Sequence, residues 1–515
     1  MYNKSPFADW VPKPLMLLFI LFILFPIMSI SGVYTTAATD ISGGLAMYNE
    51  FISLANNATT IGMGLSMLIV LRVKMRFRSK EIITTSTIIL ATLSIVIATT
   101  DNPFVLVACS LLIGFFKMFP LIEMILPMMF ILSPTGDKGR FYAIFYPLSI
   151  IAGQISSYYF ASFVFDSGYQ SPYYIMAIIM LIISVISLIF QHNQRFCFKL
   201  PLYQIDWLSM FILLISTMGF NIGLTFMKQQ AWFVSPLVVW SLCIGIVAFI
   251  ALVIRQKYVK RPFFNFASFY KMPNVGHSMI LLLFLGIYLA SSSIFSQYTV
   301  GVLEYNNLIN AKINLWMIPG IVIAGVLAFV GFKKAWNVKY YIAAGFIAFF
   351  FHTLSLYFLM QMQMDINYLN YSMILKGMGM GLLFIGIWYY ASLDLPMDKL
   401  FGIMCILLIA RGFITTAIGG AIIGWTTYQG QWQSLNDISM YLDMGSLQNG
   451  MSMFKALNLN ALMASGKIVL GSLLWLIIPI LIFVFSHHYG RFNYRRIVLF
   501  RKAIKGNSVK GYKLK

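Results

Sequence analysis

Long apolar runs, separated by short polar segments, dominate the chain. Runs of about 20 apolar residues are long enough to cross the hydrocarbon core of a bilayer as helices. Fourteen membrane-spanning helices are predicted on this basis, at 14–36, 51–71, 82–100, 103–132, 142–165, 172–190, 207–227, 233–254, 276–298, 311–331, 339–360, 369–391, 400–426 and 468–487. An even number of spans places both termini on the same side of the membrane.

The composition agrees with this pattern. Hydrophobic residues make up 60% of the 515 residues and charged residues only 10%, and the mean hydropathy is +0.83. Because soluble domains carry roughly a quarter charged residues, an ordinary soluble protein is excluded. The sequence predicts an all-α polytopic membrane protein with the lipid bilayer as its solvent.

Basic residues decide the predicted orientation. The formal net charge is +21, and most lysines and arginines fall at the termini and in the connections that share their side. By the positive-inside rule both termini are predicted to be cytoplasmic, in a multi-pass protein of the inner (cytoplasmic) membrane. Basic runs at 74–80, 255–261 and 491–506 fit topology signals and anionic-lipid contacts, with protein docking as the alternative. They are not gathered with base-stacking aromatics, so no nucleic-acid partner is predicted.

Several kinds of chemistry lack their motifs. The four cysteines form no C-x-x-C pair, and the five histidines form no cluster that could converge on one ion, so no disulfide or metal site is predicted. No phosphate-binding G-x-x-x-x-G-K-[ST] run exists. The first apolar run, 14–36, lacks a signal-peptide cleavage pattern and is predicted to be the first span. We therefore predict no cofactor and no enzyme, but transport that does not hydrolyse ATP.

The middle of the chain carries a recognisable order of features. YQIDWLSMFILLISTMGFNIGL (203–224) is followed by QQAWFVSPL (229–237) and RQKYVKRPFFNFASFYKMPN (255–274). With Asp206, Trp207, Trp232 and Pro262 in place, this order resembles the insert that joins the halves of fourteen-helix drug:proton antiporters of the major facilitator superfamily, EmrB/QacA type. One departure is Gln154, which stands where those antiporters carry a proline in a Gly-Pro-rich motif.

The resemblance implies a domain organisation and an activity. It implies a six-helix bundle at 1–200, two linker helices at 201–262, and a second six-helix bundle at 263–515. The spans and the basic residues add an external loop at 427–467 and a basic cytoplasmic tail at 488–515 to the last of these. It further implies a multidrug-type secondary transporter that exports an amphipathic compound in exchange for protons by alternating access.

Four ionisable residues lie inside predicted spans: Lys117, Glu123, Lys376 and Arg411. A charge at the bilayer centre costs about 2.5–3.5 kcal/mol on insertion scales, so such groups usually face a bundle interior or a water-filled cavity. Lys117, Lys376 and Arg411 are therefore candidates for lining a substrate cavity. The alternative is structural pairing, with Glu123 bound to Lys376 or Arg411.

The balance of these charges predicts substrate and coupling. Glu123 is the candidate proton carrier, because it is the only carboxylate well inside a predicted span, and Asp40 and Glu50 are reserve candidates near the outer ends of the first two spans. Three cations against one carboxylate favour neutral or anionic amphipathic substrates. Lys117 and Arg411 are the expected anion-facing groups, and Lys376 is a candidate partner of Glu123. Cations bound to helix-end carbonyls are the alternative.

Other functions remain open at the level of sequence. Uptake of an organic acid is a rival within transport, and a non-transporting membrane sensor or scaffold is a rival from another class. The segment 427–467 is compatible with short amphipathic helices. It could dock a periplasmic adaptor and outer-membrane channel of a tripartite exporter, or it could cap the pore.

Overall fold

The computed structural model describes residues 7–8, 10–132, 138–193, 201–259, 262–263, 272–334, 336–393, 397–439, 450–487 and 489. Regular structure in these residues is helical, apart from one bridge between Phe7 and Gln191. Thirteen of the described helical stretches are long and apolar enough to cross a membrane, and Leu15–Ser29 is a shorter apolar helix. The predicted all-α polytopic architecture is therefore confirmed.

The N-terminal half is a bundle of six main helices. They are α1 (Lys13–Ser29), α3 (Asn49–Arg76), α4 (Ser79–Thr99), α5 (Pro103–Leu132), α6 (Lys138–Ser167) and α7 (Ser171–Phe190), with the short η1 (Thr35–Ala37) and α2 (Ala38–Gly44) after α1. The tightest packing joins α3 to α5. A Cβ atom at Gly62 would lie 2.1 Å from the carbonyl oxygen of Leu111, so only glycine allows this approach.

Two further helices follow: α8 (Trp207–Phe226), with η2 (Leu202–Gln204) before it, and, after η3 (Trp232–Val234), α9 (Pro236–Tyr258). The Asp206 side chain caps α8 by accepting the Ser209 backbone N–H. Within the membrane, the Asn57 side-chain amide donates to Asn221 Oδ1 at 2.9 Å, which fastens α8 to α3 of the N-terminal half.

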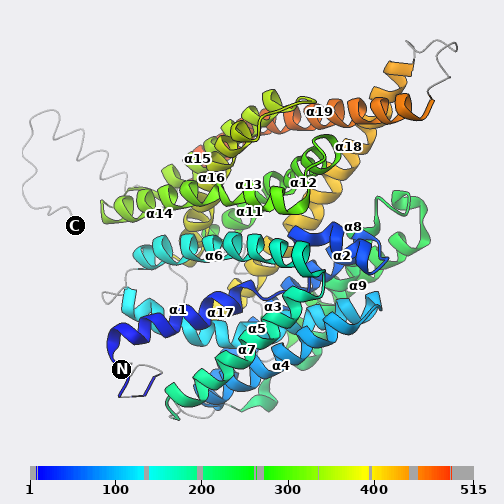
Figure 1. Cartoon of the computed structure of the whole chain (residues 1–515). Helices are drawn as coiled ribbons and strands as arrows, with labels where there is room; N and C mark the ends of the chain where they lie inside the picture. Colours follow the sequence, from blue (N-terminus) through cyan, green and yellow to red (C-terminus); the bar gives the residue numbers. More distant parts are fainter. Residues whose placement is uncertain are drawn as a thin grey trace, which may run out of the picture.

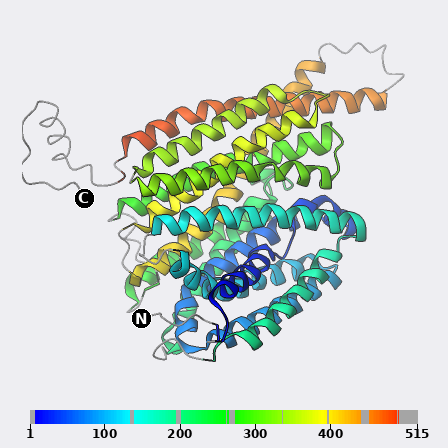
Figure 2. The same cartoon turned by 60° about the vertical axis from the view of Figure 1, so that its left-hand side comes forward.

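The C-terminal half begins with α11 (Pro273–Ala290), α12 (Ser292–Gln297) and the π-helical turn η4 (Tyr298–Val302). It continues with α13 (Asn307–Leu315), α14 (Met317–Lys333), α15 (Val338–Leu359) and α16 (Ile366–Ser392). It ends with α17 (Met397–Ile409), the π-helical turn η5 (Ala410–Ile414), α18 (Thr415–Ser439) and α19 (Gly450–Ser486). Figures 1 and 2 show most of these helices stacked against the N-terminal bundle, whereas α17 lies beside α3 of that bundle.

The two halves meet along α6 and α3. The helix α6 packs against α13, α14 and α16, and α3 packs against α17. Gly325 of α14 lies against Pro147 of α6, and the Tyr146 and Trp388 rings stack with centroids 6.1 Å apart. These four pairs of helices form the main part of the interface between the halves in the described residues.

The helix directions define two ends of the bundle. The first residues of α1 and the last of α19 lie at the same end (Figure 2), as an even number of spans requires. At this end, which we call the inner end, the Lys138 ammonium of α6 donates to the Ser392 carbonyl of α16 at 3.2 Å. The opposite end is called the outer end.

Several predicted boundaries were wrong. The span predicted at 14–36 is helical only to Ser29, and an unwound stretch separates α1 from η1. The span predicted at 400–426 contains the π-helical turn η5. In the predicted external segment 427–467, for which short amphipathic helices were considered, residues 427–439 and 450–467 are the ends of α18 and α19, which extend the outer end (Figure 1). Residues 440–449 and, except for Tyr489, the predicted tail 488–515 lie outside the described residues.

The cytoplasmic location of the inner end remains a prediction, and cysteine labelling tests it. In a background without the four native cysteines, we expect Gln433→Cys on α18 to react with a membrane-impermeant maleimide in intact cells. Arg76→Cys, at the inner end of α3, is the matched site that should react only after permeabilisation. Both side chains are exposed, so access to the reagent depends on the side of the membrane. The reverse pattern would contradict the assignment.

Candidate functional site

A cavity of about 370 Å³ lies between the two halves. Its walls come from η1 and α2, from α6, and from α11 to α14 and α16. The lining residues are Thr35, Thr36, Ala38, Thr39, Gln154, Ser157, Leu289, Ser292, Phe295, Ser296, Asn307, Asn310, Ala311, Asn314, Met317, Lys376 and Met380. Hydroxyls and amides predominate, with a few apolar side chains. A pocket of this size, with convergent polar groups, suits a small solute.

Lys376 is the charged residue of this lining. Its side chain is 6% exposed, and its ammonium donates to the Ser292 hydroxyl at 2.8 Å. Lys376 lies on α16, and the next residue, Gly377, allows this helix to approach α14 closely. A Cβ atom at Gly377 would lie 2.1 Å from the Met317 carbonyl oxygen. No carboxylate pairs with Lys376 within the described residues. The cavity therefore contains a positive charge that no acidic side chain there balances.

Lys117 has a different environment. Its ammonium donates to the Ile30 carbonyl at 2.7 Å and to the Met28 carbonyl at 3.3 Å, at the end of α1. Carbonyls at a helix end have no intrahelical partner, so a cation that binds them stabilises the break. Lys117 therefore matches the alternative of a cation bound to helix-end carbonyls, and it is not among the residues that line the cavity.

The break in the first span is held by specific contacts. Gly32 lies so close to α5 that a Cβ atom would meet the Ser110 side chain. Tyr173 of α7 donates its hydroxyl to the Gly32 carbonyl at 3.3 Å. Irregular backbone at membrane depth is tolerated where it is buried in protein or lines a cavity. Here the stretch leads directly into Thr35 and Thr36, which line the cavity.

Arg411 lies in the π-helical turn η5. Its guanidinium is 4.0 Å from the centre of the Phe384 ring, a cation–π contact. The side chain is half-buried, is not among the cavity-lining residues, and makes no ion pair within the described residues. π-helical turns are often found at functional sites, but the structure does not bring Arg411 and Lys376 into one lining.

Glu123 pairs with Lys74, which lies between the predicted spans 51–71 and 82–100. Its Oε2 lies 2.5 Å from the Lys74 ammonium and 3.3 Å from the Ser79 hydroxyl. Both members of the ion pair are buried, at 3% exposed for Glu123 and 5% for Lys74. The suggested contacts of Glu123 with Lys376 or Arg411 are therefore not formed. The carboxylate is paired instead with Lys74, in the last turns of α3.

The two reserve acids lie near the outer end. Asp40 is exposed and accepts a hydrogen bond from the Asn307 amide at 2.7 Å, which links α2 to α13 across the two halves. Glu50 lies half-buried in the first turn of α3. Neither lines the cavity, although Asn307 does.

Sequence reasoning missed the amide face of the cavity. Asn307, Asn310 and Asn314 follow one another at i, i+3 and i+7, a spacing that places them on one face of a helix. All three line the cavity. The spacing of these amide side chains, next to an apolar run, was the signal in the sequence that could have indicated a polar helix face. The ionisable residues alone do not reveal this face.

Comparison with known proteins extends the fold assignment. No protein-family model and no curated protein matches the sequence. Among solved structures, the chain is similar to a variant of the nucleoside transporter NupG (15% identity, 90% of this chain and 99% of that chain, TM-score 0.53). It is also similar to a POT family transporter in complex with 5-aminolevulinic acid (14%, 93% and 98%, TM-score 0.59) and to a structure described for substrate recognition in proton dependent oligopeptide transporters (12%, 91% and 97%, TM-score 0.56).

These alignments extend over nearly the whole of each chain, at identities that carry information about the fold alone. Together with the two stacked bundles and the linker helices, they show that this chain has the major facilitator fold.

Proposed function

We propose that the chain is a secondary active transporter that moves a small neutral or anionic amphipathic solute by alternating access, coupled to protons. The observation that carries the proposal is the cavity between the halves, where Lys376 is surrounded by amides, hydroxyls and a few apolar side chains. An uncompensated cation in a region of low dielectric attracts an anion and repels a cation. The solved structures with this fold are described as transporters, which supports the same class of function.

Within this proposal, Lys376 contacts the anionic or most polar part of the solute. The asparagines of α13, with Gln154 of α6 opposite them, supply hydrogen bonds from both halves. Side chains such as Phe295 and Met380 suit an apolar part. A solute held by both halves can be released to either side when they separate at one end, as alternating access requires.

We propose net export, following the resemblance of the linker region to drug:proton antiporters. Uptake of an organic acid uses the same cavity chemistry and differs in the direction of net movement. A docking role of the extended α18 and α19 for a periplasmic adaptor is also part of the export proposal. A sensor or scaffold has no need for an interrupted first span beside a polar cavity, so we place it last.

The test is flux in proteoliposomes with an imposed pH gradient. We expect a carboxylated amphipathic dye to accumulate on the more acidic side, from which protons leave in exchange. This accumulation should disappear when an ionophore removes the gradient. A quaternary ammonium dye of similar size is the matched control and should move poorly, because Lys376 repels it. Efficient transport of the cationic dye alone would contradict the proposed substrate charge. Accumulation of the carboxylated dye in the direction of proton flow would identify uptake, and binding without flux would favour a sensor.

A further inference from the structure

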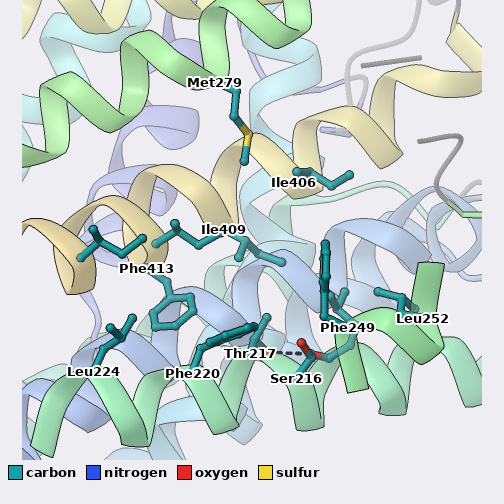
Figure 3. Close-up of a pocket in the computed structure, with 13 residues that line it drawn as sticks. Ser216, Thr217, Phe220, Leu224, Phe249, Leu252, Met279, Ile406, Ile409 and Phe413 are labelled. Carbon is teal, nitrogen blue, oxygen red and sulfur yellow. Dashed lines mark hydrogen bonds between the residues drawn. The ribbon is translucent and has the colours of Figure 1, made fainter. Parts of the chain in front are cut away.

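A second cavity lies between the linker helices and the C-terminal half. Its volume is about 420 Å³. Figure 3 shows its two walls: Phe220 and Leu224 belong to α8 on one side, and Met279 and Ile406 belong to α11 and α17 on the other. None of its lining residues lines the cavity between the halves. We call it the linker groove.

The described residues that line the linker groove offer no polar group to a ligand or to water. Its two polar residues are Ser216 and Thr217, whose hydroxyls donate to the carbonyls of Gly245 at 2.9 Å and Leu213 at 2.8 Å. Apolar cavities without hydrogen-bond partners stay dry and bind apolar molecules. The occupant must therefore present an apolar surface along the whole groove.

The shape of the groove indicates a long, thin occupant. Its lining runs along α8 from Leu213 to Leu224, which corresponds to about 16 Å of helix at 1.5 Å per residue. This direction follows the helix axes and hence the acyl chains of a bilayer. The groove also reaches the lipid-facing surface, because Phe249 both lines it and is 43% exposed.

Two basic side chains, Arg255 and Lys257, and one acidic side chain, Asp206, lie near the inner end of the groove. Arg255 follows the lining residue Leu252 by three positions on α9, so it lies on the same face, one turn nearer the inner end. It is 35% exposed while its Nη2 pairs with Asp206 at 2.8 Å. Burial by itself raises the pKa of the Asp206 carboxyl, but hydrogen bonds from Arg255 and Ser209 outweigh it and lower that pKa. Lys257, in the same last turn of α9, is exposed.

We propose that the linker groove binds an acyl chain of an anionic membrane phospholipid, with the phosphate at Arg255 and Lys257. Basic positions between helices on the cytoplasmic side are suited to anionic headgroups. The hydrogen bond between Asn57 and Asn221 joins α8 to the N-terminal half. The linker groove therefore lies at the boundary between the C-terminal half and the N-terminal half with its linker helices. The lipid occupies this boundary. This inference needs only a membrane-embedded chain and does not rest on the proposed transport activity.

Native mass spectrometry of the delipidated full-length protein tests the proposal. Phosphatidylglycerol is titrated in detergent, with phosphatidylethanolamine of identical acyl chains as the zwitterionic control. We expect one phosphatidylglycerol molecule to bind about tenfold or more tightly than the next, equivalent to about 1.4 kcal/mol. Phosphatidylethanolamine should bind this site more weakly. Equal binding of many molecules of either lipid would overturn the proposal.

Variants locate the bound lipid. Ile406→Trp and Leu224→Trp fill the groove from opposite walls, and each should remove the tight site. Val247→Trp on α9 is the matched control, because Val247 is 66% exposed and outside the groove. Lys257→Gln should weaken phosphatidylglycerol more than phosphatidylethanolamine, because the ammonium of the zwitterionic headgroup already offsets its phosphate. Retention of the tight site in both groove-filled variants, with unchanged melting temperatures, would overturn the assignment. If one of the two groove-filling variants fails to fold, the other still tests the location of the lipid.

Discussion

Replacing Lys376 with methionine is expected to lower the transport rate of an anionic substrate, at concentrations below saturation, by about a hundredfold to a thousandfold. A cation about 4 Å from an anion contributes ~4 kcal/mol at an effective dielectric constant near 20, which corresponds to nearly a thousandfold in affinity. Methionine keeps a similar length without the charge. Removing an unpaired buried charge leaves the fold intact, so the loss would reflect substrate binding.

Two companion variants make this prediction specific. Asn314→Asp adds a carboxylate to the same lining and should reduce transport of the anion by neutralising Lys376. Lys312→Met, on the same helix α13 but exposed and outside the lining, should transport normally. Initial rates in proteoliposomes, with expression and melting temperature as controls, provide the measurement. Undiminished anion transport by Lys376→Met would show that the substrate lies elsewhere.

The helices were predictable because their cause is local. A run of apolar residues long enough to cross the bilayer must satisfy its backbone internally, and the sequence shows such runs directly. The interruptions were not predictable in this way. The break after Ser29 depends on Lys117, 87 residues away from Ile30, and on the close approach of Gly32 to Ser110. Partners so distant in the chain leave no periodic signal in the broken segment itself.

The buried charges were likewise predictable only in part from the sequence. Their presence in the spans was visible from sequence, and their burial at Lys117, Glu123 and Lys376 is observed. Their partners were not visible. Lys74 belongs to a basic run that reads as a cytoplasmic loop, but α3 continues to Arg76 and tight packing of α3 on α5 turns Lys74 inward. Whether a lysine at a helix end is solvated or buried depends on that packing.

The pair of Lys74 and Glu123 gives the second large expected effect. Lys74→Met alone should destabilise the protein by about 3–5 kcal/mol, because it leaves a buried carboxylate without its counter-ion. The double variant Lys74→Met/Glu123→Met should recover most of this loss, since replacing a buried ion pair by apolar side chains is often neutral or stabilising by about 1–4 kcal/mol. Thermal or denaturant unfolding of the purified variants measures both changes.

The same double variant tests whether Glu123 carries the coupled proton. We propose that protonation of Glu123 breaks its pair with Lys74 during the transport cycle. The double variant then folds but loses pH-driven accumulation, while exchange of labelled for unlabelled substrate, which needs no net proton movement, continues. Glu123→Gln should behave in the same way, and Glu81→Gln, an exposed acid at the start of α4, is the control that keeps coupling. A stable double variant with normal pH-driven accumulation would show that the pair is structural and that another group carries the proton.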